Sequence, residues 1–353
     1  MSNFFKSFLL TLLSISVVFY FRFKKIKKAQ FSSVKSEYKD YFDPRTKVYL
    51  KKKDSIFFIR SQNFYKSFIS FLKSKNTIFF NHIFNLNYIF GKILFLKKKQ
   101  VDKLNYNFLS NIFKYLRLKE FYMIDDYRHI QLFSKICSEN NIKLFLYQHG
   151  RFSTSQSIQK NIRNINFERY YVWSNFFKKK LLKIDDKFNQ EKIFIKKRFK
   201  DYNFFKKDFS KKILIIQENK ISKYQYDLII NKILTSKISY DIFFKLRPFE
   251  KEDPNFVKFL IEKKINILKE INVLNLMKEN FEFLISFNST MLLESSFYGI
   301  APIMVYEKKP QLIDYVNDKV FFISKIRDLD KNLINFRKKK FSKVKIFKSK
   351  VWK

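Results

Sequence analysis

The segment FLISFNSTMLLESSFYGIAPIMVYE, residues 283–307, indicates the fold of this chain more clearly than any other. Its first five residues, 283–287, read as a buried strand, which a polar turn joins to a helix over 290–298. Gly299 is one of only three glycines in 353 residues, so it is expected to have a backbone role, and it closes the helix. A second apolar strand follows at 302–306. A strand, a helix of this length and another strand form a βαβ unit, which places the two strands parallel.

The same alternation of strands and helices extends outward from this segment in both directions. In the second half of the chain, further strands are expected at 213–216, 240–246, 271–274 and 320–324, with helices at 224–234 and 255–264. In the first half, short apolar runs predict strands at 55–60, 77–80, 93–96, 120–125, 143–148 and 170–173, with helices at 64–73, 104–118, 127–140 and 175–183.

This pattern predicts an α/β protein with two Rossmann-like, doubly wound domains. The first is expected over 50–197 and the second over 213–340. The charged segment 198–212 has no clean periodicity and is taken as the linker between them. Two such domains are expected to face a cleft, with ligands bound at the carboxyl ends of the strands.

An uncharged apolar run, SFLLTLLSISVVFYF at 7–21, stands near the start of the chain, and a basic cluster follows it. We expect a hydrophobic helix with a basic collar over 1–30. The run is short for a membrane-spanning helix, which needs about 20 apolar residues. The favoured interpretation is a helix anchored in one face of a membrane, with the rest of the chain on the cytoplasmic side of an inner membrane. The alternative is a helix buried against the first domain.

The net charge of +42 favours anionic partners such as a nucleotide, a nucleic acid or an anionic membrane surface. The codon usage of an AT-rich genome could also produce this excess of lysine. No helix-turn-helix, zinc-finger or RNP pattern is found in the sequence, so nucleic acid is not expected as a partner. The single cysteine, Cys137, excludes an intramolecular disulfide and a cysteine-rich metal site, and its helical surroundings predict a buried core thiol.

Two groups in the first half are candidates for proton transfer. Gln148, His149, Gly150 and Arg151 follow a buried strand, and a histidine in such a loop is well placed to act as a general base. His149 could equally be a hydrogen-bonded turn residue. Asp126, which also follows a strand, is either a general base or a cap of the next helix.

Two cations, Lys245 and Arg247, stand at the tip of the expected strand 240–246. Cations at the end of a parallel strand can bind a diphosphate, and Arg can do so through two hydrogen bonds. The alternative is a solvated basic loop.

Polar residues also surround the start of the expected helix 290–298. Ser286, Ser289 and Thr290 are well placed to cap backbone N–H groups and to leave others facing an anion. Glu294 lies one turn into the helix and could accept hydrogen bonds from ribose hydroxyls. Ordinary capping of a structural helix would also account for these residue types.

Taken in chain order, five segments resemble bacterial GT-B glycosyltransferases: IDD (124–126), YQHG (147–150), YYVWSNFFKKKL (170–181), KLRP (245–248) and SFNSTMLLESSFYGIAPI (286–303). The resemblance covers about residues 120–310. It is nearest to capsule and surface-carbohydrate transferases and to the CDP-glycerol glycerophosphotransferase group. The last segment is also similar to the donor-nucleotide block of UDP-N-acetylglucosamine 2-epimerases. Two departures stand out: Ser174 replaces a usual glycine, and Arg247 replaces a histidine found in several relatives.

The resemblance implies transfer of a sugar from a nucleotide-sugar donor to a lipid-linked or growing glycan, as in capsule or lipopolysaccharide synthesis. Ser289 and Thr290 would bind the donor phosphate, and Glu294 the ribose. Lys245 and Arg247 would neutralise the leaving diphosphate, and either His149 or Asp126 would take the acceptor's proton. No metal and no cofactor would be needed. The alternatives are a sugar-nucleotide 2-epimerase or a polyol-phosphate transferase on the same scaffold and, less favoured, a basic nucleic-acid-binding protein.

Overall fold

The computed structural model describes residues 3–23, 28–32, 56–59, 77–78, 80–124, 130–148, 152, 162–196, 209–218, 221–247, 253–268, 276, 279–310, 315 and 317–352. The chain forms two compact units. Unit 1 comprises Met1–His149, Ser157–Val172 and Ile184–Arg198. Unit 2 comprises Gly150–Gln156, Trp173–Lys183 and Phe199–Lys353. The expected first domain, 50–197, therefore does not coincide with unit 1, because two of its segments belong to unit 2.

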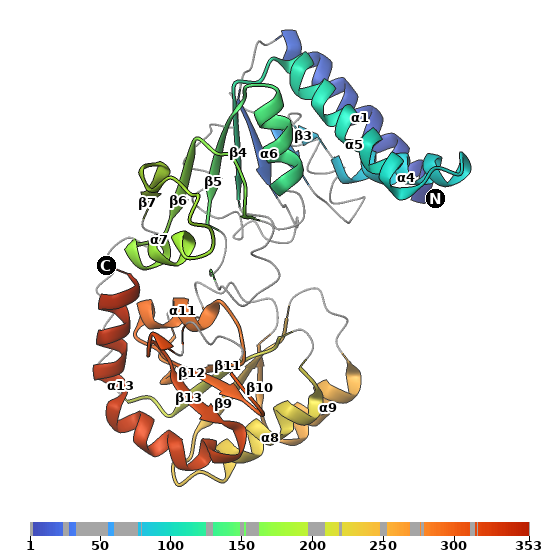
Figure 1. The fold of residues 1–353 in the computed structure, drawn as a ribbon. Coiled ribbons are helices and arrows are strands. Elements are labelled where there is room, and N and C mark those ends of the chain that lie inside the picture. Colours follow the sequence, from blue (N-terminus) through green and yellow to red (C-terminus); the bar gives the residue numbers. More distant parts are fainter. Residues whose placement is uncertain are drawn as a thin grey trace. The chain divides into compact units, whose positions relative to one another are not determined.

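Unit 1 is built on a parallel sheet with the strand order β3-β2-β1-β4-β5-β6-β7 (Figure 1). Its strands are β1 (Lys28–Ser32), β2 (Ile56–Ile59), β3 (Thr77–Ile78), β4 (Glu120–Ile124), β5 (Lys143–Tyr147), β6 (Arg169–Val172) and β7 (Ile193–Ile195). Its described helices are α1 (Asn3–Phe23), α4 (Phe80–Ile93), α5 (Lys98–Leu116), α6 (Ile130–Glu139) and the short η3 (Gln190–Lys192). Every strand pair in this sheet is parallel, as expected.

The core of unit 1 is aromatic. Phe121 of β4 lies between Phe113 of α5 and Phe133 of α6, with ring centroids 5.1 and 5.0 Å apart. All three rings are fully buried. Cys137 of α6 is buried as well, which raises the pKa of its thiol and confirms the predicted core thiol.

The N-terminal apolar run forms α1, which packs against α4 and α5 through Leu10, Val17 and Val18. One face of α1 is therefore buried against the first domain, as in the alternative interpretation of the sequence, and the other face is exposed. None of the described helices combines the length and the hydropathy that a membrane-crossing segment requires. An anchoring role for this helix stays a prediction.

Two expectations for unit 1 are wrong. The run 93–96 is not a strand but the end of α4 and the turn into α5. An apolar run of four residues has no periodicity that separates a strand from a helix end. Conversely β1, which lies between β2 and β4, was not expected, because the charged and polar residues around Phe31 hide an apolar pattern. The expected helix at 64–73 lies outside the described residues.

Unit 2 is built on a second parallel sheet, with the order β10-β9-β8-β11-β12-β13. Its strands are β8 (Lys212–Ile216), β9 (Asp241–Lys245), β10 (Asn266–Leu268), β11 (Phe283–Ser286), β12 (Ala301–Tyr306) and β13 (Phe322–Lys325). Its described helices are α7 (Asn175–Leu182), α8 (Lys223–Leu234), α9 (Pro254–Glu262), α11 (Met291–Ser295), η4 (Ser296–Tyr298), η5 (Ile326–Asp328) and α13 (Leu329–Val351). The expected strand at 271–274 lies outside the described residues.

Side chains alternate between the two faces of this sheet, as the strand period of two requires. Ile213, Phe244 and Ile285 belong to one buried cluster with residues of α8 and α9. Leu214 and Leu284 are equally buried and point to the opposite face. Figure 1 shows α8 and α9 on one side of the sheet and α11 on the other, which is the doubly wound arrangement.

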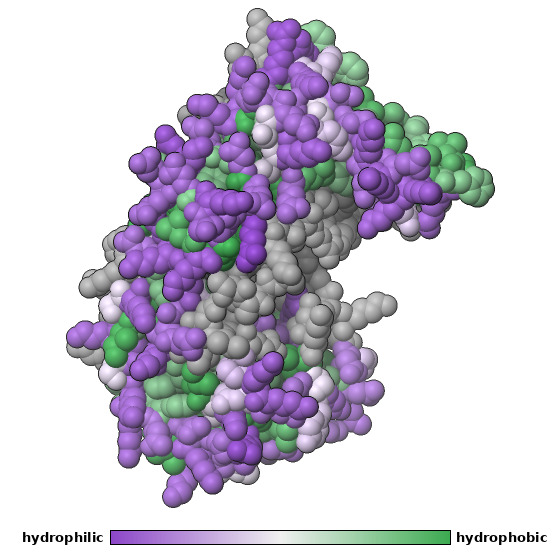
Figure 2. Space-filling model, viewed as in Figure 1, coloured by the Kyte–Doolittle hydropathy of each residue, from purple (hydrophilic) through white to green (hydrophobic). Residues whose placement is uncertain are grey.

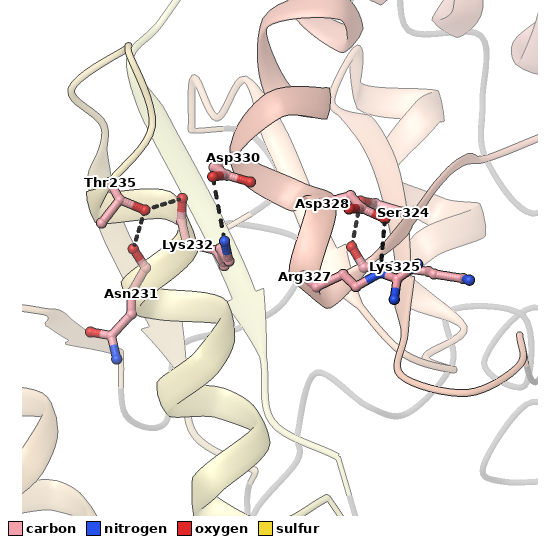
Figure 3. A network of polar contacts seen from close by, with 8 residues as sticks. All are labelled: Asn231, Lys232, Thr235, Ser324, Lys325, Arg327, Asp328 and Asp330. Atoms are coloured by element: carbon pink, nitrogen blue, oxygen red, sulfur yellow. Dashed lines mark hydrogen bonds and ion pairs between the residues drawn. The ribbon is translucent and has the colours of Figure 1, made fainter.

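Polar contacts connect α8 to the start of α13 (Figure 3). The Lys232 ammonium in the last turn of α8 lies 3.4 Å from a carboxylate oxygen of Asp330. Asp330 is in the first turn of α13, where a negative charge is favourable to the helix dipole. The Thr235 hydroxyl, which donates to the Asn231 carbonyl oxygen at 2.9 Å, closes the end of α8. Of these contacts, the one between Lys232 and Asp330 joins α8 to α13.

The far end of α13 holds α7, a helix from the first half of the sequence, within unit 2. Trp352 lies against Trp173 and Phe177, with ring centroids 6.0 and 5.8 Å apart. The Ser174 hydroxyl donates to the Val351 carbonyl oxygen. The Trp352 indole N–H donates to the Ser296 hydroxyl oxygen at 3.2 Å. The segment 173–183 therefore folds as part of unit 2.

We predict that Trp352→Ala lowers the free energy of unfolding of unit 2 by about 3–5 kcal/mol, the usual cost of removing a buried tryptophan. The chain has two tryptophans, so the variant leaves Trp173 as its single intrinsic reporter. Urea unfolding followed by Trp173 fluorescence measures the effect. Ile346→Ala, at an exposed position of α13, should cost less than about 0.5 kcal/mol. Equal costs in both variants would contradict the packing described.

Candidate functional site

The strand order of unit 2 reverses between β8 and β11, and the candidate site lies where these strands and β9 end. In open parallel sheets, ligands bind outside the carboxyl ends of the strands at such a reversal. The register pairs Ile216 with Lys245, and Ile285 with Ile215. Because side chains alternate between the two faces of the sheet, Lys245 and Ser286 lie on the face opposite α8. Glu218, two residues beyond Ile216, lies on the same face.

Glu218 is the centre of the hydrogen bonding at this edge. One oxygen of its carboxylate accepts the backbone N–H groups of Phe287 and Asn288 at 2.7 and 2.8 Å, and the Ser286 hydroxyl also donates to it. The Ser286 oxygen in turn accepts the N–H of Ser289 at 3.2 Å. The backbone N–H of Glu218 donates to the Tyr226 hydroxyl oxygen at 2.7 Å. The turn after β11 is thus shaped around a carboxylate.

Lys245, the last residue of β9, is a buried cation with 4 % of its surface exposed. Within the described part of the chain its ammonium contacts the Leu246 carbonyl oxygen at 3.5 Å, a long hydrogen bond. Burial lowers the pKa of Lys245 because removal from water disfavours the charged form. A negatively charged ligand at this edge would offset that cost.

Arg247 lies beside Lys245 but is exposed. Its backbone N–H donates to the Gln217 side-chain oxygen at 2.7 Å, and the Gln217 N–H donates to the Lys245 carbonyl oxygen at 3.0 Å. Gln217 therefore ties the ends of β8 and β9 together, and it holds the backbone from which the Arg247 guanidinium extends.

The helix expected over 290–298 is split into the five-residue α11 and the 3₁₀ turn η4. Gly299 ends it, as expected, with φ 79°. The Ser289 hydroxyl oxygen accepts the Met291 N–H at 3.2 Å, so Ser289 is engaged as a cap. Thr290 makes no side-chain capping bond, and Glu294 is buried. Their predicted roles toward phosphate and ribose stay predictions.

Of the candidate residues in the first half, the structure describes Gln148. It is fully buried just beyond β5, and its N–H donates to the Tyr171 carbonyl oxygen at 2.9 Å. Asp126, His149, Gly150 and Arg151 lie outside the described residues. The choice between His149 and Asp126 as base, and the expected cleft, stay predictions.

Sequence reasoning missed Glu218, although one signal was present. Gln217 and Glu218 follow the buried strand 213–216 directly, in the same way that Lys245 and Arg247 follow 240–246. Polar residues immediately after a buried parallel strand reach the carboxyl edge of the sheet. Applying that rule to every strand of the second half would have singled out this pair.

The described residues contain no group of three or more His, Cys, Asp or Glu side chains that could hold a metal ion. Among the described residues, the charged groups at this edge of unit 2 are the Lys245 ammonium, the Arg247 guanidinium and the Glu218 carboxylate, which is engaged with backbone N–H groups. Such an arrangement suits recognition of an anionic ligand by hydrogen bonds and charge.

No family model matches the chain, and no curated protein matches it by sequence. Solved structures do match. HepE of Anabaena in complex with UDP has a TM-score of 0.54 and 9% identity, over 92% of this chain and 95% of that one. A UDP-GlcNAc 2-epimerase of Neisseria meningitidis bound to UDP-GlcNAc gives 0.56 and 11%, over 90% and 94%. MnaA of S. aureus with UDP gives 0.56 and 8%, over 90% of each chain. At such identities the similarity establishes a GT-B-like α/β fold alone.

We predict that Glu218→Ala lowers the free energy of unfolding by about 2–3 kcal/mol, because it leaves two backbone N–H groups and a hydroxyl without their acceptor. Glu218→Gln keeps an acceptor oxygen in the same place and should cost about 1 kcal/mol. Urea unfolding of the two variants measures the difference. If both variants lost the same stability, the carboxylate geometry would not be what shapes this turn.

Proposed function

We propose that the chain is a glycosyltransferase that takes a sugar from a nucleotide-sugar donor and passes it to a lipid-linked or growing glycan. The observation that carries the proposal is Lys245, a buried cation at the edge where β8, β9 and β11 end. The diphosphate of a nucleotide sugar supplies the negative charge that this ammonium favours. The related structures with UDP and UDP-GlcNAc support UDP as the nucleotide.

In the proposed reaction, the acceptor hydroxyl attacks the anomeric carbon of the donor sugar and the bond to the diphosphate breaks. Lys245 and Arg247 stabilise the charge that develops on the leaving diphosphate, and no metal ion is required. Ser289 and Thr290 lie toward the phosphates and Glu294 toward the ribose. His149 or Asp126 takes the proton from the attacking hydroxyl. Capsule or lipopolysaccharide synthesis is the proposed setting.

A UDP-sugar 2-epimerase is the second candidate, and the similarity to the Neisseria enzyme favours it. The two functions differ in what they require. An epimerase converts its sugar nucleotide with no acceptor present, whereas a transferase releases UDP only as an acceptor is glycosylated. Incubating the protein with UDP-GlcNAc alone separates them, because an interconverted sugar nucleotide in that mixture would exclude the transferase.

We predict that UDP raises the melting temperature of the protein and that Lys245→Met weakens UDP binding about tenfold or more, since it removes a charged hydrogen-bond donor. A thermal-shift titration with UDP, CDP and GDP, followed by calorimetry, measures both effects. Lys237→Met, at an exposed position between α8 and β9, is the matched control and should bind as the unaltered chain does. Equal affinity in the two variants would remove Lys245 from the site.

We predict that UDP affinity falls as the pH rises into the alkaline range. Burial lowers the pKa of Lys245 in the free protein, and a bound diphosphate raises it again because it favours the ammonium. Between these two pKa values the complex holds one more proton than the free protein. Calorimetry in buffers of different ionisation enthalpy measures this proton uptake. Arg247→Ala should weaken binding but keep the uptake, whereas uptake that persists in Lys245→Met would contradict the assignment.

A further inference from the structure

The outward face of α1 is apolar, although the helix already buries its opposite face. Leu10, Ser14 and Val17 are buried against the neighbouring helices. The exposed apolar side chains recur at intervals of three, four or seven residues, which keeps them on one side of the helix, with the exposed Ser16 between Leu12 and Phe19; they are Phe5, Phe8, Leu12, Phe19 and Phe23. A helix that is apolar on both faces is typical of a buried element, so this outward face fits a further apolar partner.

A second apolar projection lies at the turn between α4 and α5. Ile93, Leu94 and Phe95 are 62%, 64% and 95% exposed. Phe95 has φ 52°, a left-handed conformation that bulky residues rarely adopt. The Leu94 N–H donates to the Phe90 carbonyl oxygen at 2.9 Å, and the Leu96 N–H to that of Gly91 at 2.7 Å. The phenyl ring is therefore held in water by an ordered, hydrogen-bonded turn.

Gly91 is part of what builds this turn. A Cβ atom at this position would collide with the Cγ2 methyl group of Val101 on α5. The glycine thus permits α4 and α5 to approach closely just before the turn. Gly91, one of three glycines in the chain, is therefore required for the close packing of α4 and α5 next to the turn that contains Phe95.

The start of the α1 stripe, with Phe5 and Phe8, lies at the same end of the three-helix layer as the turn, whereas Phe19 and Phe23 lie toward the other end. Phe19, near the end of α1, meets Tyr115 at the end of α5 with ring centroids 5.7 Å apart, and Arg22 lies over the same ring. α1 and α5 have similar lengths and run in the same direction, so the start of α1 lies beside the turn that precedes α5. Figure 1 shows the N-terminus next to that turn.

Lysine surrounds this apolar surface. Between residues 92 and 103 the basic residues are Lys92, Lys97, Lys98, Lys99 and Lys103, and Asp102 is the single acid. The α1 and α4 segments contain no Asp or Glu at all. Figure 2 shows hydrophobic surface running along this layer, with hydrophilic side chains beside it. The occupant of the surface is therefore expected to be both apolar and anionic.

We propose that the outward face of α1 and the α4–α5 turn dock on the surface of an anionic lipid bilayer. Phe95 and Leu94 enter the boundary between head groups and acyl chains, and Lys97, Lys98 and Lys99 lie at the phosphates. A protein partner fits less well, since lysine is depleted in protein interfaces. The proposal rests on unit 1 alone and does not depend on the nucleotide site of unit 2.

Vesicle sedimentation of the full-length protein tests the apolar contribution. Vesicles of phosphatidylglycerol and phosphatidylethanolamine should bind it, and Leu94→Ser with Phe95→Ser should weaken binding about tenfold or more. The matched control is Tyr224→Ser with Ile261→Ser, two exposed apolar positions in unit 2. Both double variants should keep the circular-dichroism spectrum and the cooperative melting of the unaltered protein, which shows that they are folded.

The charge contribution is tested separately. Changing Lys97, Lys98 and Lys99 to Gln should weaken binding to these vesicles about tenfold or more and reduce its salt dependence. Changing Lys338, Lys339 and Lys345 on α13, which are also exposed, makes the same change in net charge and should leave binding unaltered. Vesicles of phosphatidylcholine alone should bind the unaltered protein weakly.

Insertion itself has a spectroscopic signature. In Phe95→Trp, anionic vesicles should shift the emission of the new tryptophan to shorter wavelength, while the two native tryptophans are already buried. Brominated acyl chains should quench it. Absence of vesicle binding, binding unaffected by the changes at Leu94 and Phe95, or a solution dimer that Phe95→Ser dissociates would each overturn the proposal. The dimer would show that a second copy covers this surface.

Discussion

The carboxylate of Glu218 is the group on which the candidate site depends. It gives the N–H groups of Phe287 and Asn288 an acceptor inside the protein, at the point where the strand order reverses. Buried N–H groups without such an acceptor would cost about 1–3 kcal/mol each. Within the described residues this carboxylate accepts these donors, and the Lys245 ammonium contacts the Leu246 carbonyl oxygen instead. The Glu218 carboxylate thus shapes the turn that follows β11.

The second half of the fold follows from its sequence because its signals are local and consistent. Apolar runs such as 213–216 and 283–287 are short, rich in isoleucine and phenylalanine, and separated by helices with a clear period. Gly299 is expected to end a helix, and it does, with φ 79°. The contact between Glu218 and Ser286 could not be derived in this way. It joins residues 68 positions apart, and the pairing of β8 with β11 decides it.

Unit 1 was harder to predict for a physical reason. The run 93–96 is apolar, but Ile93, Leu94 and Phe95 are exposed at the end of α4 and in the turn that follows it. Hydrophobicity normally indicates the interior, so the pattern predicted a strand. The β1 strand gave the opposite error, since Lys28 and Gln30 alternate with smaller and aromatic residues. In both cases the short segment lacked a pattern that identifies its structure, whereas the helices α5 and α6 were found because their periods span several turns.

The packing of α7 shows why a domain cannot be defined here by a contiguous stretch of sequence. A fragment beginning at 199 would carry α13 but not Trp173 or Phe177, so it would expose the Trp352 ring. It would also leave Asp318 without Lys180, whose ammonium lies 2.6 Å from the Asp318 carboxylate and also over the Tyr315 ring. The hydrophobic and ionic contacts that complete unit 2 therefore come from a segment that precedes its sheet. The extent of unit 2 is therefore set by contacts between residues and not by a continuous stretch of sequence.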